Sequence, residues 1–237
     1  MTITHHQVTQ GTPEWLELRR GMLTASEMGT LITPKTKKAA ENEKTRSLLF
    51  ELAAQRISGF VEPSFVSDDM ERGTLDEATA RRVYSEHTGN VVSQVGFITN
   101  DRHGFVLGYS PDGLVEADPY AERFGQIEIK SRRQKFQIET ILDQQVPAEY
   151  VIQIQTGLIV TERAWCDFIS FSGGLHMPII RVFPDPKLQS AILDVGSNAT
   201  ARIRAMERDH ATIVSANGWP MTERVDYGAG GEIEVSE

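Results

Sequence analysis

Two acidic residues and a lysine have the types and the spacing that could do chemistry. Glu128 and Lys130 alternate with Ile127 and Ile129 after a glycine, a pattern typical of a β-strand. Residues two apart in a strand stand on the same face, so the carboxylate and the ammonium should project together, opposite the two isoleucines. Such a pair suits metal-assisted phosphodiester hydrolysis, in which one group holds Mg²⁺ and the other steadies or deprotonates the attacking water. A solvated ion pair on a wet strand face is the alternative interpretation.

A second carboxylate lies upstream of this pair. Asp112 ends a Ser-Pro-Asp bend and precedes a glycine, between the apolar segments 107–109 and 114–115. By itself this composition predicts only an ordinary turn. Adjacent strands lie about 4.8 Å apart, so Asp112 and Glu128 on neighbouring strands could share a hard divalent cation bound through oxygen.

Composition sets the broad class. Of the 237 residues, 40% are hydrophobic and 24% are charged, which is the balance of a soluble globular protein. We expect one domain over residues 1–221 and an acidic, glycine-rich, disordered tail at 222–237. No apolar run approaches the roughly 20 residues of a membrane span, and no signal-peptide stretch is evident. The single cysteine, Cys166, cannot form an internal disulfide, so we expect a cytoplasmic protein.

The net charge of −9 argues against a protein that coats DNA nonspecifically, because such proteins are usually basic. It leaves a nuclease open, since acidic groups that bind metal add negative charge while basic residues gather on one surface. The group Arg132, Arg133 and Lys135 follows the proposed catalytic strand directly and is the best candidate for phosphate contacts. A solvated charged face is the alternative.

Periodicity and capping residues predict an alternation of helices and strands. Thr12 and Thr24 each precede a helix start, and the second forms a capping box with Glu27. Residues 31–45 are expected to form a mobile loop or arm. Further helices are expected at about 42–58, 68–88, 133–143, 148–160 and 186–210, and strands at 91–99, 105–107, 114–116, 126–131, 165–171 and 178–183.

Several helical positions carry polar residues that could serve a site. Ser26 falls in the first turn of a capped helix, where free N–H groups favour an anion, and Arg19 is close enough to complete a phosphate pocket. Glu77 could aid a metal site from its helix; for all three, a plain surface role is the alternative. Gln155 lies within an apolar stripe and needs a specific polar partner, since an unsatisfied buried amide costs about 1–3 kcal/mol. Gln153 points in another direction.

With these pieces in order, the chain resembles the phage lambda exonuclease family, the YqaJ-type viral recombinases of the PD-(D/E)xK nuclease superfamily. The resemblance covers about residues 11–171 and implies an α/β fold with a restriction-endonuclease-like core, a mixed central sheet flanked by helices. Five motifs in the family's order carry it: residues 14–19 with 23–26, Gly73 with Glu77, residues 110–113, residues 128–130, and residues 153–155 before Val160 and Thr161.

The resemblance implies roles for individual residues. Asp112, Glu128 and the backbone carbonyl of Ile129 would ligate Mg²⁺, with two ions per active site and Mn²⁺ expected to substitute. Lys130 would orient and activate the water, and Glu77 would support the metal-bound water network. The implied pocket for a 5′-terminal phosphate consists of Arg19, Ser26, Ser110 and Gln155, with Gln153 as a further candidate.

The family's activity is degradation of one strand of linear double-stranded DNA from its 5′ end. That activity releases 5′-mononucleotides and leaves 3′ overhangs for a single-strand annealing protein. The resemblance also implies a ring-shaped homotrimer around the DNA, encoded by a phage or prophage and located in the cytoplasm of a bacterial host. A strand-separating apolar wedge is not assigned, although Leu31 and Ile32 lie near its expected place. An inserted-looking loop at 117–124 leaves the strand register between Asp112 and Glu128 less certain. The alternatives are a RecB- or Cas4-like nuclease of other polarity and a catalytically inert module that binds DNA or a protein partner.

Overall fold

The computed structural model describes residues 2–62, 68–116 and 124–224, with backbone only at 68–71. The expected loop at 117–124 and the expected tail at 222–237 therefore lie almost wholly outside the described residues. Within these ranges the chain alternates helices and strands, as the sequence predicted.

The larger sheet has five strands. In spatial order they are β11 (Ile179–Val182), β10 (Trp165–Phe171), β9 (Gly125–Ser131), β8 (Gly113–Val115) and β5 (Val92–Ser93). Strands β9 and β10 run parallel, whereas β8 pairs antiparallel with both β9 and β5, and β11 pairs antiparallel with β10. The central sheet is therefore mixed, which confirms the expected fold class.

Two smaller sheets contain the other strands of the described residues. A four-stranded sheet has the order β1 (Ile3–His6), β6 (Phe97–Asn100), β7 (Leu107–Tyr109) and β2 (Leu23–Thr24), and a hairpin pairs β3 (Ile32–Thr33) with β4 (Lys38–Ala39).

Residues 91–99 were expected to be one strand but belong to two sheets, because β5 and β6 separate at Gly96. A Cβ added to Gly96 would lie 1.7 Å from the carbonyl oxygen of Val8, so only glycine permits this approach.

The expectation of a mobile arm at 31–45 is wrong. This segment contains the β3–β4 hairpin, and Thr33 and Lys37 are joined by a backbone hydrogen bond. Leu31 and Ile32 are both fully buried in the main hydrophobic core, which also makes them unsuitable as an exposed wedge.

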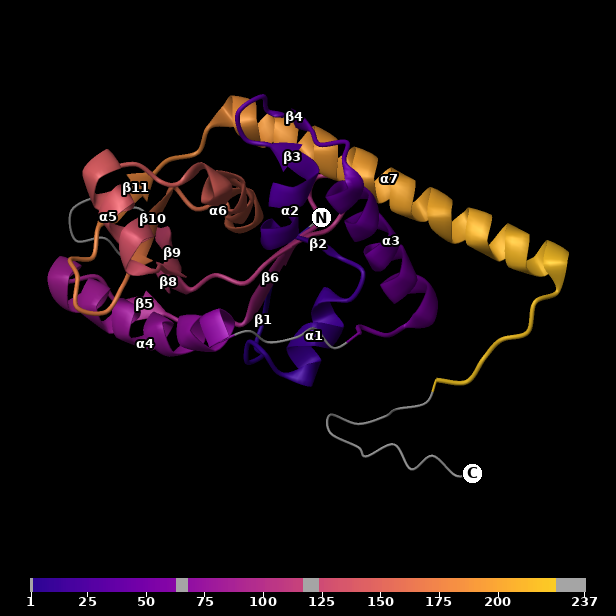
Figure 1. The fold of residues 1–237 in the computed structure, drawn as a ribbon, viewed down its shortest axis with the longest axis horizontal. Helices are drawn as coiled ribbons and strands as arrows, with labels where there is room; N and C mark the ends of the chain where they lie inside the picture. Colours follow the sequence, from indigo (N-terminus) through magenta and orange to yellow (C-terminus); the bar gives the residue numbers. More distant parts are fainter. Residues whose placement is uncertain (1, 63–67, 117–123, 225–237) are drawn as a thin grey trace.

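The helices begin at the expected caps. They are α1 (Pro13–Arg19), α2 (Ala25–Leu31), α3 (Glu43–Ser58), α4 (Asp68–Thr88), α5 (Gln134–Asp143), α6 (Ala148–Thr161) and α7 (Pro186–Asn217). Thr12 accepts from the backbone of α1, and Thr24 with Glu27 forms the expected capping box of α2. Helix α7 continues past the expected end near residue 210 to Gly218, whose φ of +63° ends it. Its last turns extend beyond the body of the molecule (Figure 1).

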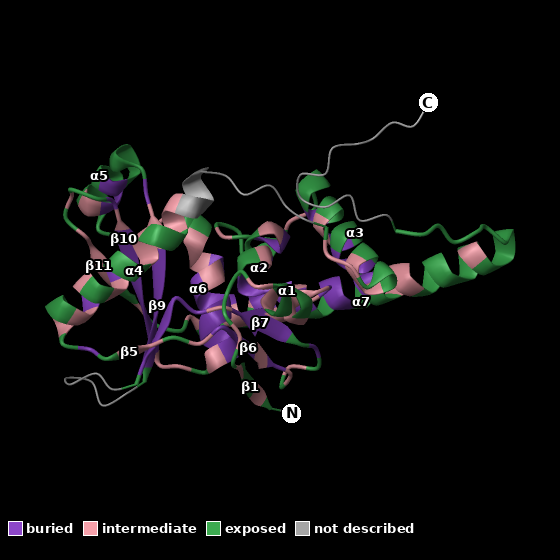
Figure 2. Ribbon diagram, turned by 90° about the horizontal axis from the view of Figure 1, so that it is seen from below, coloured by how far each residue is buried: buried purple, intermediate pink, exposed green. Residues whose placement is uncertain are grey.

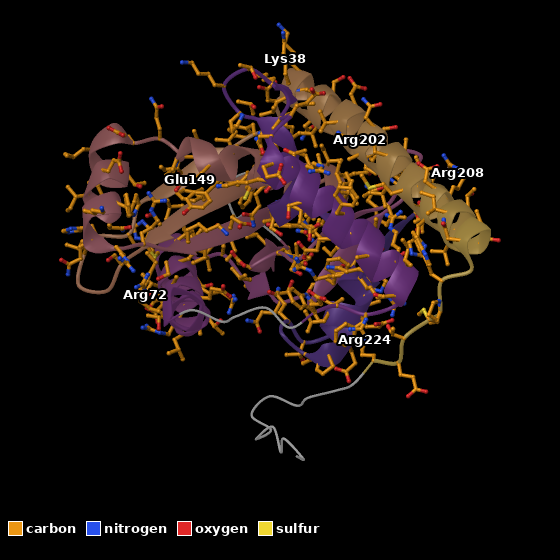
Figure 3. All side chains as sticks on the ribbon, turned by 45° about the vertical axis from the view of Figure 1, so that its right-hand side comes forward. Lys38, Arg72, Glu149, Arg202, Arg208 and Arg224 are labelled. Carbon is orange, nitrogen blue, oxygen red and sulfur yellow. The ribbon has the colours of Figure 1, made fainter. Side chains whose placement is uncertain are left out.

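Two helices sandwich the central strand β9 (Figure 2). Ala80 and Tyr84 of α4 pack with Ile127 and Ile129 on one face of the sheet. On the opposite face, side chains of α6 pack against β10. Exposed charged residues such as Arg202 and Arg208 instead line the outer side of α7 (Figure 3). No helix in the described ranges is both long enough and apolar enough to span a bilayer.

Candidate active site

The strand face that carries Glu128 is covered by protein. Glu128 is only 1% exposed, because α6 lies over the face opposite Ile127 and Ile129. Its carboxylate accepts hydrogen bonds from the hydroxyl of Tyr109 (2.7 Å) and from Nε2 of Gln153 (2.5 Å). These contacts exclude the interpretation of Glu128 as half of a solvated ion pair.

Asp112 lies beside Glu128. In the β8–β9 ladder Gly113 is opposite Ile127, so Asp112 stands next to Glu128 immediately past the last pair. Its Oδ2 accepts a hydrogen bond of 2.5 Å from the backbone N–H of Ile129. Burial, and then the negative charge of Glu128, raise the pKa of Asp112 well above its ordinary value. Two adjacent buried carboxylates are the arrangement that a bound divalent cation stabilises.

Lys130 completes the group predicted on β9. Its Nζ lies 2.7 Å from Oε1 of Glu128 and 5.4 Å from the ring centroid of Tyr150. Burial alone lowers the pKa of Lys130, but the carboxylates of Glu128 and Asp112 outweigh it and raise the pKa above its ordinary value. The side chain is therefore cationic at neutral pH, and it can orient a water molecule or stabilise developing negative charge.

Glu77 faces the same site from α4. Burial is the largest influence and raises the pKa of Glu77, while the charges of Arg81 and Lys130 lower it in part. Glu77 is half-buried, unlike its exposed helical neighbour Ala78. The position of Glu77 in the cavity favours a role at the site over that of a plain surface acid.

These groups line one cavity of about 480 Å³. It is enclosed by segments from the helical part of the chain and from both main sheets. Residues with a sequence-predicted role in its lining are Arg19, Ser26, Glu77, Ser110, Asp112, Glu128, Ile129, Lys130 and Gln153.

A further part of the cavity wall is built from α1, α2 and the bend before β8. The guanidinium of Arg19 lies 4.1 Å from the ring centroid of Trp15, and the indole N–H of Trp15 donates to Oγ of Ser110 at 2.8 Å. Arg19 also reaches Oγ1 of Thr24, which lies 3.0 Å from the exposed hydroxyl of Ser26. A cation and two hydroxyl groups thus face one space, a donor set that suits a phosphate.

Comparison with known proteins places the chain in a family. The model of the YqaJ-like viral recombinase domain matches residues 14–164, which is more than half of the chain. The chain belongs to this family. No curated protein sequence matches it significantly.

Solved structures agree with this membership. An alkaline exonuclease from Laribacter hongkongensis is 30% identical, with a TM-score of 0.69 over 85% of this chain and 100% of that one. The same enzyme in complex with dAMP matches at 32% identity, with the same TM-score and coverage. A phage-related exonuclease from Haemophilus somnus, 13% identical over 80% of this chain and 96% of that one, has a TM-score of 0.55 and shares the fold.

Gln155 is the one predicted site residue that the YqaJ-like domain does not bring to the cavity. It is buried on α6, but its Nε2 donates to the carbonyl of Phe183 (2.8 Å) and its Oε1 accepts from the N–H of Asp185 (2.9 Å). Gln155 thus has the specific polar partners that its burial requires, at the start of α7 rather than in a phosphate pocket. Two residues apart on a helix point in nearly opposite directions, and it is Gln153 that reaches Glu128.

The basic group after β9 is only partly available for phosphate contacts. Arg132 is 8% exposed, and its Nη1 donates to Glu149 (2.8 Å) and to the hydroxyl of Tyr150 (2.9 Å). Arg133 and Lys135 are exposed. Arg72 of α4 donates to Oγ of Ser131, which lines the cavity, at 3.1 Å.

The sequence did not predict a site role for three residues that hydrogen-bond to the predicted site residues. Tyr109, Trp15 and Thr24 line the cavity and bond directly to predicted site residues. Tyr109 immediately precedes the bend and Trp15 lies four residues before Arg19, so their nearness in the chain was the available signal. The sequence assigned Thr24 only to its capping box with Glu27, and it assigned no partner to Tyr109 or Trp15.

The donor set fits a hard cation. In the described ranges, no three acidic, histidine or cysteine side chains already form a metal cage. A cation would instead take the two strand carboxylates, Asp112 and Glu128, with backbone carbonyl oxygen and water, the oxygen ligands that Mg²⁺ prefers. The raised pKa of Asp112 supports this fit, because a bound cation would relieve the repulsion from Glu128.

Proposed function

We propose that this chain is a Mg²⁺-dependent exonuclease that digests one strand of linear double-stranded DNA from its 5′ end. One observation carries the proposal. The paired carboxylates with Lys130, and the Arg19 group with its hydroxyls, line a single cavity. A site that holds a terminal phosphate beside a hydrolytic centre cleaves near the end of a strand, because binding fixes the position of the reacting bond.

In this proposal Asp112, Glu128 and the Ile129 carbonyl hold the metal, with two ions per site and Mn²⁺ able to substitute. Bound Mg²⁺ supplies Lewis-acid stabilisation of the attacking and leaving oxygens. Tyr109 and Gln153 orient Glu128 through their hydrogen bonds to its two carboxylate oxygens.

Lys130 and Glu77 act on the water from β9 and from α4, respectively, in the same cavity. The ammonium of Lys130 orients the attacking water and stabilises negative charge that develops on the phosphate. Tyr150 limits the movement of Lys130, because its ring lies against the ammonium. Glu77 accepts hydrogen bonds from water that surrounds the metal.

The terminal phosphate is recognised by Arg19 with Ser26 and Ser110. Hydrogen bonds between a guanidinium and a phosphate are charge-assisted and directional. Stacking on Trp15 fixes the plane of the Arg19 guanidinium before DNA binds, which reduces the entropy lost on binding.

The products would be 5′-mononucleotides and a 3′ overhang. The Laribacter enzyme was crystallised with dAMP, a deoxynucleoside monophosphate, which supports this assignment. A phage or prophage origin in a bacterial cytoplasm, a ring of three subunits and delivery of the overhang to a single-strand annealing protein complete the proposal.

Digestion of duplex DNA labelled at either the 5′ or the 3′ end tests the polarity. We expect early release of the 5′ label as a mononucleotide, faster from a 5′-phosphate than from a 5′-hydroxyl. Early release of the 3′ label would instead support the RecB- or Cas4-like alternative. Binding of DNA ends without any release under these conditions would support the inert module.

A further inference from the structure

Besides the bond from Trp15 to Ser110, three hydrogen bonds in the described residues hold Pro111 and Asp112 of the bend. Nε2 of Gln10 donates to the carbonyl of Pro111 (3.1 Å), and Nε of Arg81 donates to the carbonyl of Asp112 (2.8 Å). The third is the hydrogen bond from the Ile129 N–H to the Asp112 side chain. Of the donors in these three bonds, only Arg81 is charged, and only Arg81 comes from a helix.

Arg81 lies one helical turn after Glu77. Residues four apart on a helix share a face, so the two side chains leave α4 in the same direction. Arg81 therefore ties the helix that presents Glu77 to the bend that presents Asp112.

A second cavity, of about 330 Å³, lies behind these two acids. Glu77 and Asp112 line both this cavity and the larger one, whereas Arg81 lines only the second. The guanidinium of Arg81 also faces the amide of Gln94, whose oxygen accepts from it when the amide is turned to satisfy both groups. Arg81 thus supports Glu77 and Asp112, which lie between the two cavities, from the side of the second cavity. It does not line the larger cavity, where a substrate would bind.

We propose that Arg81 is a positioning residue that sets Asp112 relative to Glu77 and thereby raises the affinity of the site for a divalent cation. The inference rests on the proposed function and adds a residue to it. An arginine suits this task because its planar guanidinium can hold the Asp112 carbonyl through Nε and the Gln94 amide through its terminal nitrogens. A lysine offers a similar charge but not this fork.

The test compares Arg81→Gln and Arg81→Lys with Arg82→Gln. Arg82 is the next residue of α4, is exposed, and pairs with Glu86 on the same helix. Arg82→Gln therefore removes one positive charge from the same helix without changing the contacts of Asp112. Binding of Mn²⁺ to the DNA-free protein is measured by titration calorimetry, and initial rates of digestion are measured over a Mg²⁺ series.

We expect Arg81→Gln to weaken Mn²⁺ binding about 10- to 100-fold, the usual cost of losing a partner that orients a metal ligand. The Mg²⁺ concentration for half-maximal activity should rise in parallel, while the KM for DNA stays unchanged. Arg81→Lys should lie between Arg81→Gln and wild type, and Arg82→Gln should match wild type.

Mn²⁺ affinity of wild-type strength in folded Arg81→Gln would overturn the inference. If Arg81→Gln does not fold, the Mn²⁺ affinity of Arg81→Lys tests the inference instead. An affinity equal to that of wild type in Arg81→Lys would contradict the proposed role of the Arg81 guanidinium. Failure of the proposed function is a separate result, because wild type would then show no metal-dependent digestion, whatever the variants bind.

Discussion

The hydroxyl of Tyr109 donates a hydrogen bond of 2.7 Å to Glu128, from the strand that leads directly into the bend carrying Asp112. The segment that presents one carboxylate therefore also fixes the other. Tyr109 is itself 2% exposed, so the bond is shielded from solvent. Orientation of the two acids therefore depends on a contact inside the folded core.

Removing this hydroxyl tests its role. Tyr109→Phe should destabilise the fold by about 1–3 kcal/mol, the cost of leaving a buried acceptor short of a donor. It should also lower the exonuclease rate about 10-fold or more through misorientation of Glu128. Urea unfolding and initial rates measure the two effects.

Tyr84→Phe is the matched control. Tyr84 is equally buried, and its hydroxyl donates to Asp167 at 2.8 Å, outside the cavity. This variant should lose comparable stability and keep its rate at saturating Mg²⁺. Equal loss of rate in both variants would show that the Tyr109 effect is only structural.

The proposed phosphate pocket predicts a change in end preference. Arg19→Ala should reduce the preference for 5′-phosphorylated over 5′-hydroxyl DNA by about 10- to 100-fold, because a hydrogen bond to a charged group contributes about 1.5–3 kcal/mol. Gln155→Leu should leave the preference intact and lower stability instead, since Gln155 bonds the backbone before α7. Competition between the two DNA ends in one reaction measures the ratio. Loss of the preference in Gln155→Leu would restore Gln155 to the pocket.

Glu27 predicts a pH dependence of stability. Its Oε2 accepts from the Thr24 N–H at 2.8 Å, and burial raises the pKa of Glu27 above its ordinary value of 4.5 despite opposing effects from Thr24 and Arg19. A carboxyl group whose pKa is higher in the folded state contributes to the free energy of unfolding fully when the pH is below the pKa of the unfolded state. This contribution is lost as the pH rises through the pKa of the folded state. The free energy of unfolding of wild type should therefore fall, relative to Glu27→Gln, from about pH 4.5 towards neutrality. Parallel pH curves for the two proteins would contradict this account of Glu27.

Packing around Tyr109 makes Gly157 a sensitive position. A Cβ there would lie 2.8 Å from Nε2 of Gln126 and 2.9 Å from the Tyr109 ring. Alanine in a helix gains about 1 kcal/mol over glycine, but overpacking of a buried site costs about 1–3 kcal/mol, so Gly157→Ala should be destabilising and should lower activity. Gly29→Ala, also helical but with open space around the added Cβ, should be neutral or stabilising. Thermal unfolding of both variants measures the difference in their stability. A Gly157→Ala variant more stable than wild type would show that the Tyr109 ring moves at little cost to accommodate the added Cβ.

Local signals in the sequence were enough to predict most elements. The caps at Thr12 and Thr24 were correct, and the alternation around Glu128 predicted which residues of β9 share a face. Long-range placement was beyond such signals. Gly96 separates two strands because Val8 passes against it, and Leu31 and Ile32 are buried by helices distant in the sequence.

The candidate site shows the same division between local signals, which the sequence carries, and long-range contacts, which it does not. Residue type and motif order predicted that the two acids, the lysine and the arginine belong to one site, and these residues do line one cavity. They did not predict Tyr109 or Arg81, whose contribution depends on a hydrogen bond to one distant atom. Gln155 was misplaced since burial on α6 indicates only that a polar partner exists, and not which one.

The most direct measurement is release of mononucleotides from 5′-phosphorylated linear duplex DNA, with and without Mg²⁺, by wild type and by Lys130→Ala. The account predicts that wild type releases mononucleotides only when Mg²⁺ is present. It also predicts that Lys130→Ala, folded and still able to bind DNA ends, releases almost none. Undiminished release by Lys130→Ala, or release by wild type in the presence of a chelator, would contradict the account.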